Sequence, residues 1–119
     1  MTSEPETVVR RYLDHLVAHD WAALAECLHP DVVRVGPFGD TYSPRRPYVE
    51  FLSSLLPTLV NYDLTIERMV ARQSVVVVQL REAMEVNGSR DVTREALVFD
   101  TDPAGLITRI DIFIQRPPG

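Results

Sequence analysis

Apolar residues in the first half of the chain recur at helical spacing. Between Glu6 and His19 they return every three or four positions and leave polar residues on the opposite side, which predicts an amphipathic helix. Asp20 can cap a second, short helix that Pro30 ends. A third helix is predicted from Pro44 to about Leu56, with Pro57 closing it. The pattern therefore places three helices ahead of the remaining chain.

The second half of the chain alternates apolar and polar residues, as strands do. The alternation predicts a short early strand and four later ones: Val32–Val35, Val60–Ala71, Ser74–Val86, Arg90–Asp100 and Leu106–Gln115. Asn87-Gly88 is typical of a tight hairpin, and Asp102 to Gly105 forms a second turn signal. We therefore expect a single α+β domain over residues 1–119, in which three helices and a cone-shaped, curved antiparallel sheet enclose a pocket.

Composition and charge narrow the classes of partner. The chain has 119 residues, 45% of them hydrophobic, which is enough for one core. Its net charge is −5 and its basic residues are scattered, so nucleic acid is not expected as a partner. The first residues are acidic and polar, which predicts neither a signal peptide nor a membrane span. With one cysteine, Cys27, no disulfide can close within the chain, and a reducing cytoplasm fits best.

The basic residues also limit the chemistry. All twelve are arginine, which excludes a Schiff-base lysine and the lysine of a phosphate-binding loop. His15 and His19 have a spacing that can chelate a metal, but no third ligand accompanies them. We therefore expect neither a metal nor a cofactor.

Several short segments together resemble one known superfamily. In chain order they are Val8-Val9-Arg10-Arg11-Tyr12-Leu13, Asp20-Trp21, His29-Pro30-Asp31-Val32, Gly36-Pro37-Phe38-Gly39 and Gly105-Leu106-Ile107-Thr108-Arg109. This order resembles the nuclear-transport-factor-2-like proteins, SnoaL-like and ketosteroid-isomerase-like members included, over roughly residues 8–115. The family contains isomerases, polyketide cyclases, limonene-type epoxide hydrolases, scytalone dehydratase and members that only bind or dimerise. The resemblance therefore implies the scaffold and leaves the reaction open.

The resemblance carries only part of the family's catalytic set onto this chain. It implies that Tyr12 is an oxyanion donor, as in the isomerases. At three positions where relatives place a catalytic aspartate, this chain has Gly36, Leu97 and Ile112. Asp111 is adjacent to the last of these, but alternation turns it to the opposite face. The known acids of the family are therefore lost or moved.

Strand alternation suggests a replacement. Glu82 shares the otherwise apolar face of its strand, Glu95 shares the face of Leu97, and Arg34 has inward parity on the first strand. Two carboxylates and a guanidinium in an apolar cavity cannot all keep their ordinary ionisation. We hypothesise that Glu82 and Glu95 transfer protons, that Arg34 orients one of them, and that Tyr12 donates a hydrogen bond to a substrate oxygen. A purely structural ion pair at the rim of the sheet is the alternative interpretation.

The remaining pocket walls are expected to be apolar. The predicted substrate-binding residues are Phe38, Phe51, Leu52, Leu55, Leu80, Met84, Leu97, Ile110, Ile112 and Ile114. Such walls suit a hydrophobic, ring-containing small molecule. Three functions stay open: a cofactor-independent isomerase, cyclase or dehydratase acting on a polyketide-, terpenoid- or steroid-like substrate, an epoxide hydrolase, or a non-catalytic binding or dimerisation module.

The outer face of the sheet predicts self-association. Four apolar residues, Val75, Val77, Ile107 and Phe113, are expected there. A cluster of this kind is costly to leave in water, so we expect a homodimer.

Overall fold

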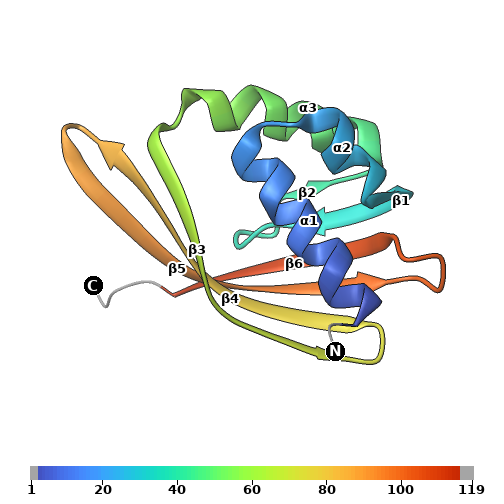
Figure 1. Ribbon diagram of the computed structural model, residues 1–119. Coiled ribbons are helices and arrows are strands. Elements are labelled where there is room, and N and C mark those ends of the chain that lie inside the picture. Colours follow the sequence, from blue (N-terminus) through green and yellow to red (C-terminus); the bar gives the residue numbers. More distant parts are fainter. Residues whose placement is uncertain (1–2, 116–119) are drawn as a thin grey trace.

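The computed structural model describes residues 3–115 (Figure 1). The helices are α1 (Glu4–Ala18), α2 (Trp21–Glu26), α3 (Arg45–Leu55) and the 3-10 turn η1 (Leu56–Thr58). The strands are β1 (Leu28–Val35), β2 (Thr41–Tyr42), β3 (Val60–Arg72), β4 (Val75–Val86), β5 (Ser89–Thr101) and β6 (Ile107–Gln115). They form one curved sheet in the order β2-β1-β6-β5-β4-β3, with the three α-helices on its concave side. The expected α+β fold class is confirmed.

Local signals fix the ends of the first two helices. The Ser3 side chain accepts a hydrogen bond from the Glu6 amide at 3.2 Å, which caps α1. As predicted, Asp20 caps α2 by accepting from the amide of Ala23 at 3.2 Å. Pro30 does not end this helix, since α2 stops at Glu26 and Pro30 lies within β1. Proline cannot donate to a strand ladder, and the pairing of β1 with β6 shifts register around it.

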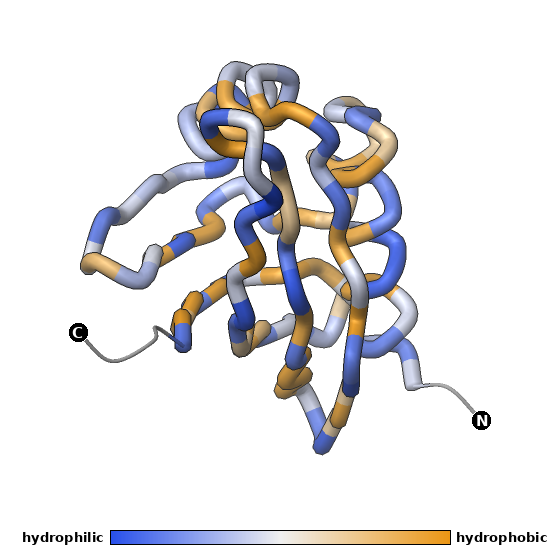
Figure 2. The backbone as a smooth tube through the Cα atoms, turned by 90° about the vertical axis from the view of Figure 1, so that its left-hand side faces the viewer, coloured by the Kyte–Doolittle hydropathy of each residue, from blue (hydrophilic) through white to orange (hydrophobic). Residues whose placement is uncertain are grey.

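Strands β3 to β6 form the expected antiparallel meander. Asn87 and Gly88 both have positive φ, 51° and 80°, as a two-residue hairpin between β4 and β5 requires. Hydrophobic and hydrophilic segments alternate along the strands (Figure 2). The sheet is mixed rather than wholly antiparallel, because β1 runs parallel to β6.

The core lies between the helices and the sheet. Its fully buried members include Val9, Tyr12, Leu24, Val76, Val78, Phe99, Ile107 and Ile110. Two predictions fail here. Ile110 was expected on the pocket wall and Ile107 on the outer face, yet both are 0% exposed and belong to the core. The register of β5 and β6 shifts between Asp100 and Thr101, and this bulge turns Ile107 to the inner face. Ile110 has the predicted inward parity, shared with Ile112 and Ile114, but it lies in the core and not on the cavity wall.

No helix among residues 3–115 is long and apolar enough to cross a membrane.

The position of Ile110 generates a stability prediction. Ile110→Ala removes a fully buried side chain, so the free energy of unfolding should decrease by about 2–5 kcal/mol. Ile114→Ala, in the same strand but only half-buried, should cost less. Urea unfolding of both variants measures the difference. Equal losses would contradict the assignment of Ile110 to the core.

Candidate functional site

A cavity of about 410 Å³ opens between the curved sheet and the helices α1 and α3. The predicted walls that line it are Phe38, Phe51, Leu52, Leu55, Leu80, Met84, Leu97, Ile112 and Ile114. Further apolar walls, not predicted, are Leu13, Leu16, Pro37, Leu56, Leu59 and Leu64. Ile110 lies behind the wall in the core and is not part of it. The cavity is therefore predominantly apolar and large enough for a small ring-containing molecule.

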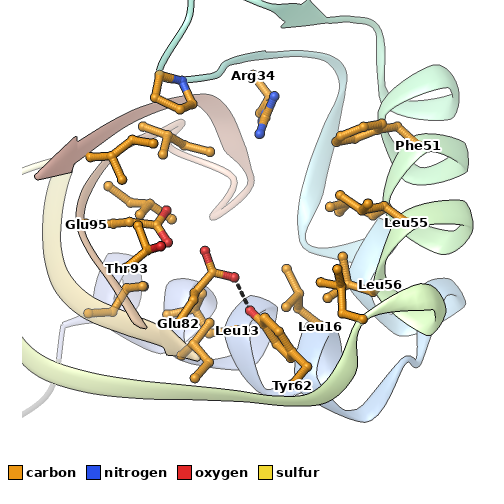
Figure 3. Close-up of a pocket in the computed structure, with 18 of the residues that line it drawn as sticks. Leu13, Leu16, Arg34, Phe51, Leu55, Leu56, Tyr62, Glu82, Thr93 and Glu95 are labelled. Atoms are coloured by element: carbon orange, nitrogen blue, oxygen red, sulfur yellow. Dashed lines mark hydrogen bonds between the residues drawn. The ribbon is translucent and has the colours of Figure 1, made fainter. Parts of the chain in front are cut away.

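The four candidate polar residues, Tyr12, Arg34, Glu82 and Glu95, all line this cavity. They come from α1, β1, β4 and β5, elements far apart in the chain. Figure 3 shows Arg34, Glu82 and Glu95 pointing into one open space. The cavity also contains polar side chains that the sequence pattern does not single out: Tyr48, Tyr62 and Thr93.

The strand ladder places the two glutamates on one face. In the β4–β5 register Glu82 is opposite Thr93 and Leu80 is opposite Glu95, so the two carboxyl groups are diagonal neighbours. Burial raises the pKa of Glu95 to about 9, with the hydrogen bond and the negative charge of Glu82 adding to the shift and Arg34 opposing it. Glu95 therefore holds a proton at neutral pH.

Tyr62 makes the surroundings of Glu82 different from those of Glu95. Its hydroxyl donates a hydrogen bond to Oε2 of Glu82 (Figure 3). Burial, followed by the charge of Glu82, raises the pKa of Tyr62 far above its ordinary value, so the phenol stays a neutral donor. The hydrophobic pattern places Tyr62 with Leu64 on the apolar face of β3. Sequence reasoning could have found Tyr62 from its hydroxyl group, because Tyr62 lies diagonal to Glu82 across the β3–β4 ladder.

Arg34 forms its ion pair outside the glutamate pair. Its Nη1 donates to Oδ2 of Asp40 at 2.8 Å, so the expected direct pairing with Glu82 or Glu95 is not what the side chains show. The tight turn after β1 brings Asp40 back beside Arg34. Gly36 leaves the room for this contact, because a Cβ there would lie 2.4 Å from Oδ1 of Asp40.

The Arg34 side chain is confined although it is charged. It is 11% exposed, and its guanidinium carbon lies 5.6 Å and 5.4 Å from the ring centroids of Tyr42 and Phe51. Its buried Nε has no hydrogen-bond partner among residues 3–115. An unsatisfied buried donor costs about 1–3 kcal/mol. This nitrogen is enclosed by the protein, so the site carries a buried donor without a partner among the described residues.

Tyr12 is paired with another tyrosine. Its hydroxyl hydrogen-bonds that of Tyr48 on α3, and both side chains are buried. Burial raises the pKa of both phenols, so both remain protonated. In such a pair one hydroxyl donates to the other, whose own proton stays available for a further acceptor.

The described residues offer no ready metal site. Within residues 3–115 no three side chains of His, Cys, Asp or Glu are grouped so that they could hold an ion. The ring of His19 stacks on Trp21, with centroids 5.5 Å apart.

Comparison with known proteins places this architecture. A family model described as a SnoaL-like domain matches residues 9–110. A search of the curated proteins finds no match. Among solved structures, a protein described as a SnoaL-like polyketide cyclase from Shewanella denitrificans is 17% identical, with a TM-score of 0.83, and the alignment covers 93% of this chain and 90% of that one.

Two further structures have the same shape. One, described as an LEH-like epoxide hydrolase from M. tuberculosis, is 21% identical with a TM-score of 0.83, over 96% of this chain and 84% of that one. The other, described as a ketosteroid isomerase from Kribbella flavida, is 21% identical with a TM-score of 0.77, over 98% and 84% of the two chains. These likenesses show a shared fold.

The raised pKa of Glu95 predicts a pH dependence of stability. In the unfolded chain the carboxyl loses its proton near its ordinary value of 4.5, whereas in the folded protein it keeps the proton to about 9. Between these values the folded state binds more protons, so this group makes the free energy of unfolding decrease as pH rises from about 4.5 to about 9. Glu95→Gln should flatten that decrease.

Urea unfolding at several pH values measures the effect. Glu85→Gln, on the exposed face of the same sheet, is the matched control and should keep the wild-type slope. A Glu95→Gln variant with an unchanged slope would show that Glu95 titrates normally.

Proposed function

Because the chain belongs to the SnoaL-like domain family, we propose that it binds a hydrophobic, ring-containing metabolite in this cavity and moves protons on it without a cofactor. The substrate is a carbonyl-bearing molecule of polyketide, terpenoid or steroid-like shape, and the reaction is an isomerisation, cyclisation or dehydration. The apolar walls and the size of the cavity support the class of ligand.

The observation that carries this proposal is the unequal state of two neighbouring carboxyl groups. Glu95 is desolvated and protonated at neutral pH, while Glu82 accepts a hydrogen bond from Tyr62. A protonated carboxyl and a second carboxyl that accepts a hydrogen bond can serve as general acid and general base in one cavity. This division suits the chemistry better than a purely structural ion pair, since Arg34 pairs with Asp40.

The roles follow from these states. Glu82 removes a proton from a substrate carbon, and Glu95 delivers a proton to a second atom of the substrate. The Tyr12–Tyr48 pair donates its remaining hydroxyl proton to a substrate oxygen. After one turnover Glu82 has gained one proton and Glu95 has lost one, and proton exchange with water restores both carboxyl groups, so that no oxidant or reductant is consumed.

Epoxide hydrolysis is the second candidate, and the same two carboxyl groups favour it. Glu82 would activate a water molecule while Glu95 protonates the epoxide oxygen. A third candidate is a non-catalytic binding module. It is favoured because the three positions where relatives have a catalytic aspartate are occupied here by Gly36, Leu97 and Ile112. Turnover of cyclic ketones, of cyclic epoxides, or of neither distinguishes the three.

Substitution of each glutamate tests the catalytic proposal. Glu82→Gln and Glu95→Gln should each lower kcat/KM by about 10²–10⁴-fold on the best substrate from a panel of unsaturated cyclic ketones and epoxides. Glu85→Gln, exposed on β4, is the matched control and should retain activity. A loss below about tenfold in both pocket variants, roughly 1.4 kcal/mol of barrier, would overturn the assignment.

We also propose that the outer face of the sheet forms a homodimer. Phe113 is 59% exposed and Val77 36% exposed there, although Ile107 is buried and takes no part. The prediction is a dimer in sedimentation velocity at micromolar concentration, and Phe113→Arg should shift it toward the monomer because a charge is then buried. A wild-type protein that sediments as a monomer would rule the interface out.

A further inference from the structure

The cavity has a cation and two carboxyl groups in its lining, but they are not paired with one another. The positive charge of Arg34 is already paired with Asp40 at 2.8 Å, and Tyr48 shares a hydrogen bond with the guanidinium. No ion pair joins Glu82 or Glu95 to a basic side chain within residues 3–115. The arginine of the cavity is therefore engaged by other protein groups, and the glutamate pair has no cationic partner among the described residues.

The glutamate pair places negative charge in the cavity although Glu95 holds a proton. After burial, which is the larger cause, the charge of Glu82 raises the pKa of both Tyr62 and Glu95. Arg34 opposes the rise of the Glu95 pKa without cancelling it, since that pKa still reaches about 9. The field at this end of the cavity therefore favours a positive ligand and disfavours a negative one.

The carboxyl oxygens accept fewer hydrogen bonds than they are able to. Oε2 of Glu82 accepts from Tyr62, and Glu82 and Glu95 share a hydrogen bond with one another. An ionised carboxylate has about four acceptor positions. Both glutamates are half-buried, line the cavity and point into its open space (Figure 3). Acceptor positions of the pair are therefore open to a ligand that donates.

Apolar side chains surround the two carboxyl groups. Leu64 lies opposite Glu82 in the β3–β4 ladder, while Leu80 and Ile114 lie opposite Glu95 in the ladders on either side of β5. A neutral ligand that displaces water from such a place leaves the negative charge poorly solvated. A cation compensates that charge while its apolar part covers the walls.

We propose that the cavity binds a hydrophobic, ring-containing ammonium ion, whose ring packs on the apolar walls and whose N–H groups donate to Glu82 and Glu95. Hydrogen bonds between charged groups are roughly twice as strong as those between neutral groups. The inference goes beyond the proposed function, because binding of the ion needs no proton transfer. An ion held there covers the carboxyl oxygens, so such amines block turnover and do not undergo it.

Three rigid molecules of nearly equal size separate the effect of charge from that of shape. At neutral pH 1-adamantylamine is a cation, 1-adamantanol is neutral and 1-adamantanecarboxylate is an anion. Isothermal titration calorimetry of the wild-type protein should rank their affinities in that order. The amine should bind at least about tenfold more tightly than the alcohol.

Three glutamate variants locate the preference. Glu82→Gln keeps the size of the side chain and removes its charge, so it should weaken binding of the amine by about tenfold or more and that of the alcohol by less than about twofold. Glu95→Gln resembles the protonated carboxyl and should cost the amine less than Glu82→Gln does. Glu85→Gln removes a carboxylate from the exposed face of β4, and as the matched control it should change neither affinity.

Several outcomes would overturn the inference. A wild-type protein that binds none of the three molecules, binds the alcohol as tightly as the amine, or prefers the carboxylate has no site for a cation. Equal losses of amine affinity in Glu82→Gln and Glu85→Gln would assign the preference to the overall charge of the protein. Equal losses of amine and alcohol in Glu82→Gln would show that Glu82 only shapes the cavity.

The same variants separate this inference from the proposed function. Binding of the amine that depends on Glu82, without turnover of any ketone or epoxide, would reject the proton transfer and leave the ammonium site standing. Loss of activity in Glu82→Gln and Glu95→Gln, without a preference for the amine, would reject the ammonium site and leave the proton transfer standing.

Discussion

Two carboxyl groups share a cavity with apolar walls, and the cost of taking charge out of water governs the site. Ionising both Glu82 and Glu95 there costs free energy, so Glu95 keeps its proton. Glu82 accepts a hydrogen bond from the hydroxyl of Tyr62. The asymmetry comes from burial and from the hydrogen bonds that Glu82 makes with Tyr62 and with Glu95. The acid and base of the proposed reaction are two ordinary residues made unequal by their surroundings.

The fold creates these surroundings by curling a long meander against helices. Strands β4 and β5 present alternate side chains to the concave face, so that the glutamates enter the space covered by α1 and α3. The parallel strand β1, on the other side of β6, adds Arg34 to the same space. Arg34 from β1 and the two carboxyl groups from β4 and β5 therefore meet in the cavity, although these strands are distant in sequence.

Much of this could be predicted from the sequence, because periodicity reports which face a side chain takes. Alternation alone placed Glu82 and Glu95 toward the cavity. It failed for Ile107, since a bulge between β5 and β6 reverses the parity at that position and no residue type announces it. It also missed Tyr62, which counts as apolar in a pattern although its hydroxyl is the functional atom. The ion pair of Asp40 depends on the path of a turn, which periodicity does not describe.

The central claim is that Glu95 holds a proton at neutral pH beside Glu82. Carbon-13 NMR of the glutamate side-chain carboxyl groups, followed across pH, measures this directly. One resonance is expected to titrate near pH 9 and to disappear in Glu95→Gln. If every glutamate resonance instead completes its titration near the ordinary value of 4.5, the two carboxyl groups are both ionised at neutral pH and the acid–base account is wrong.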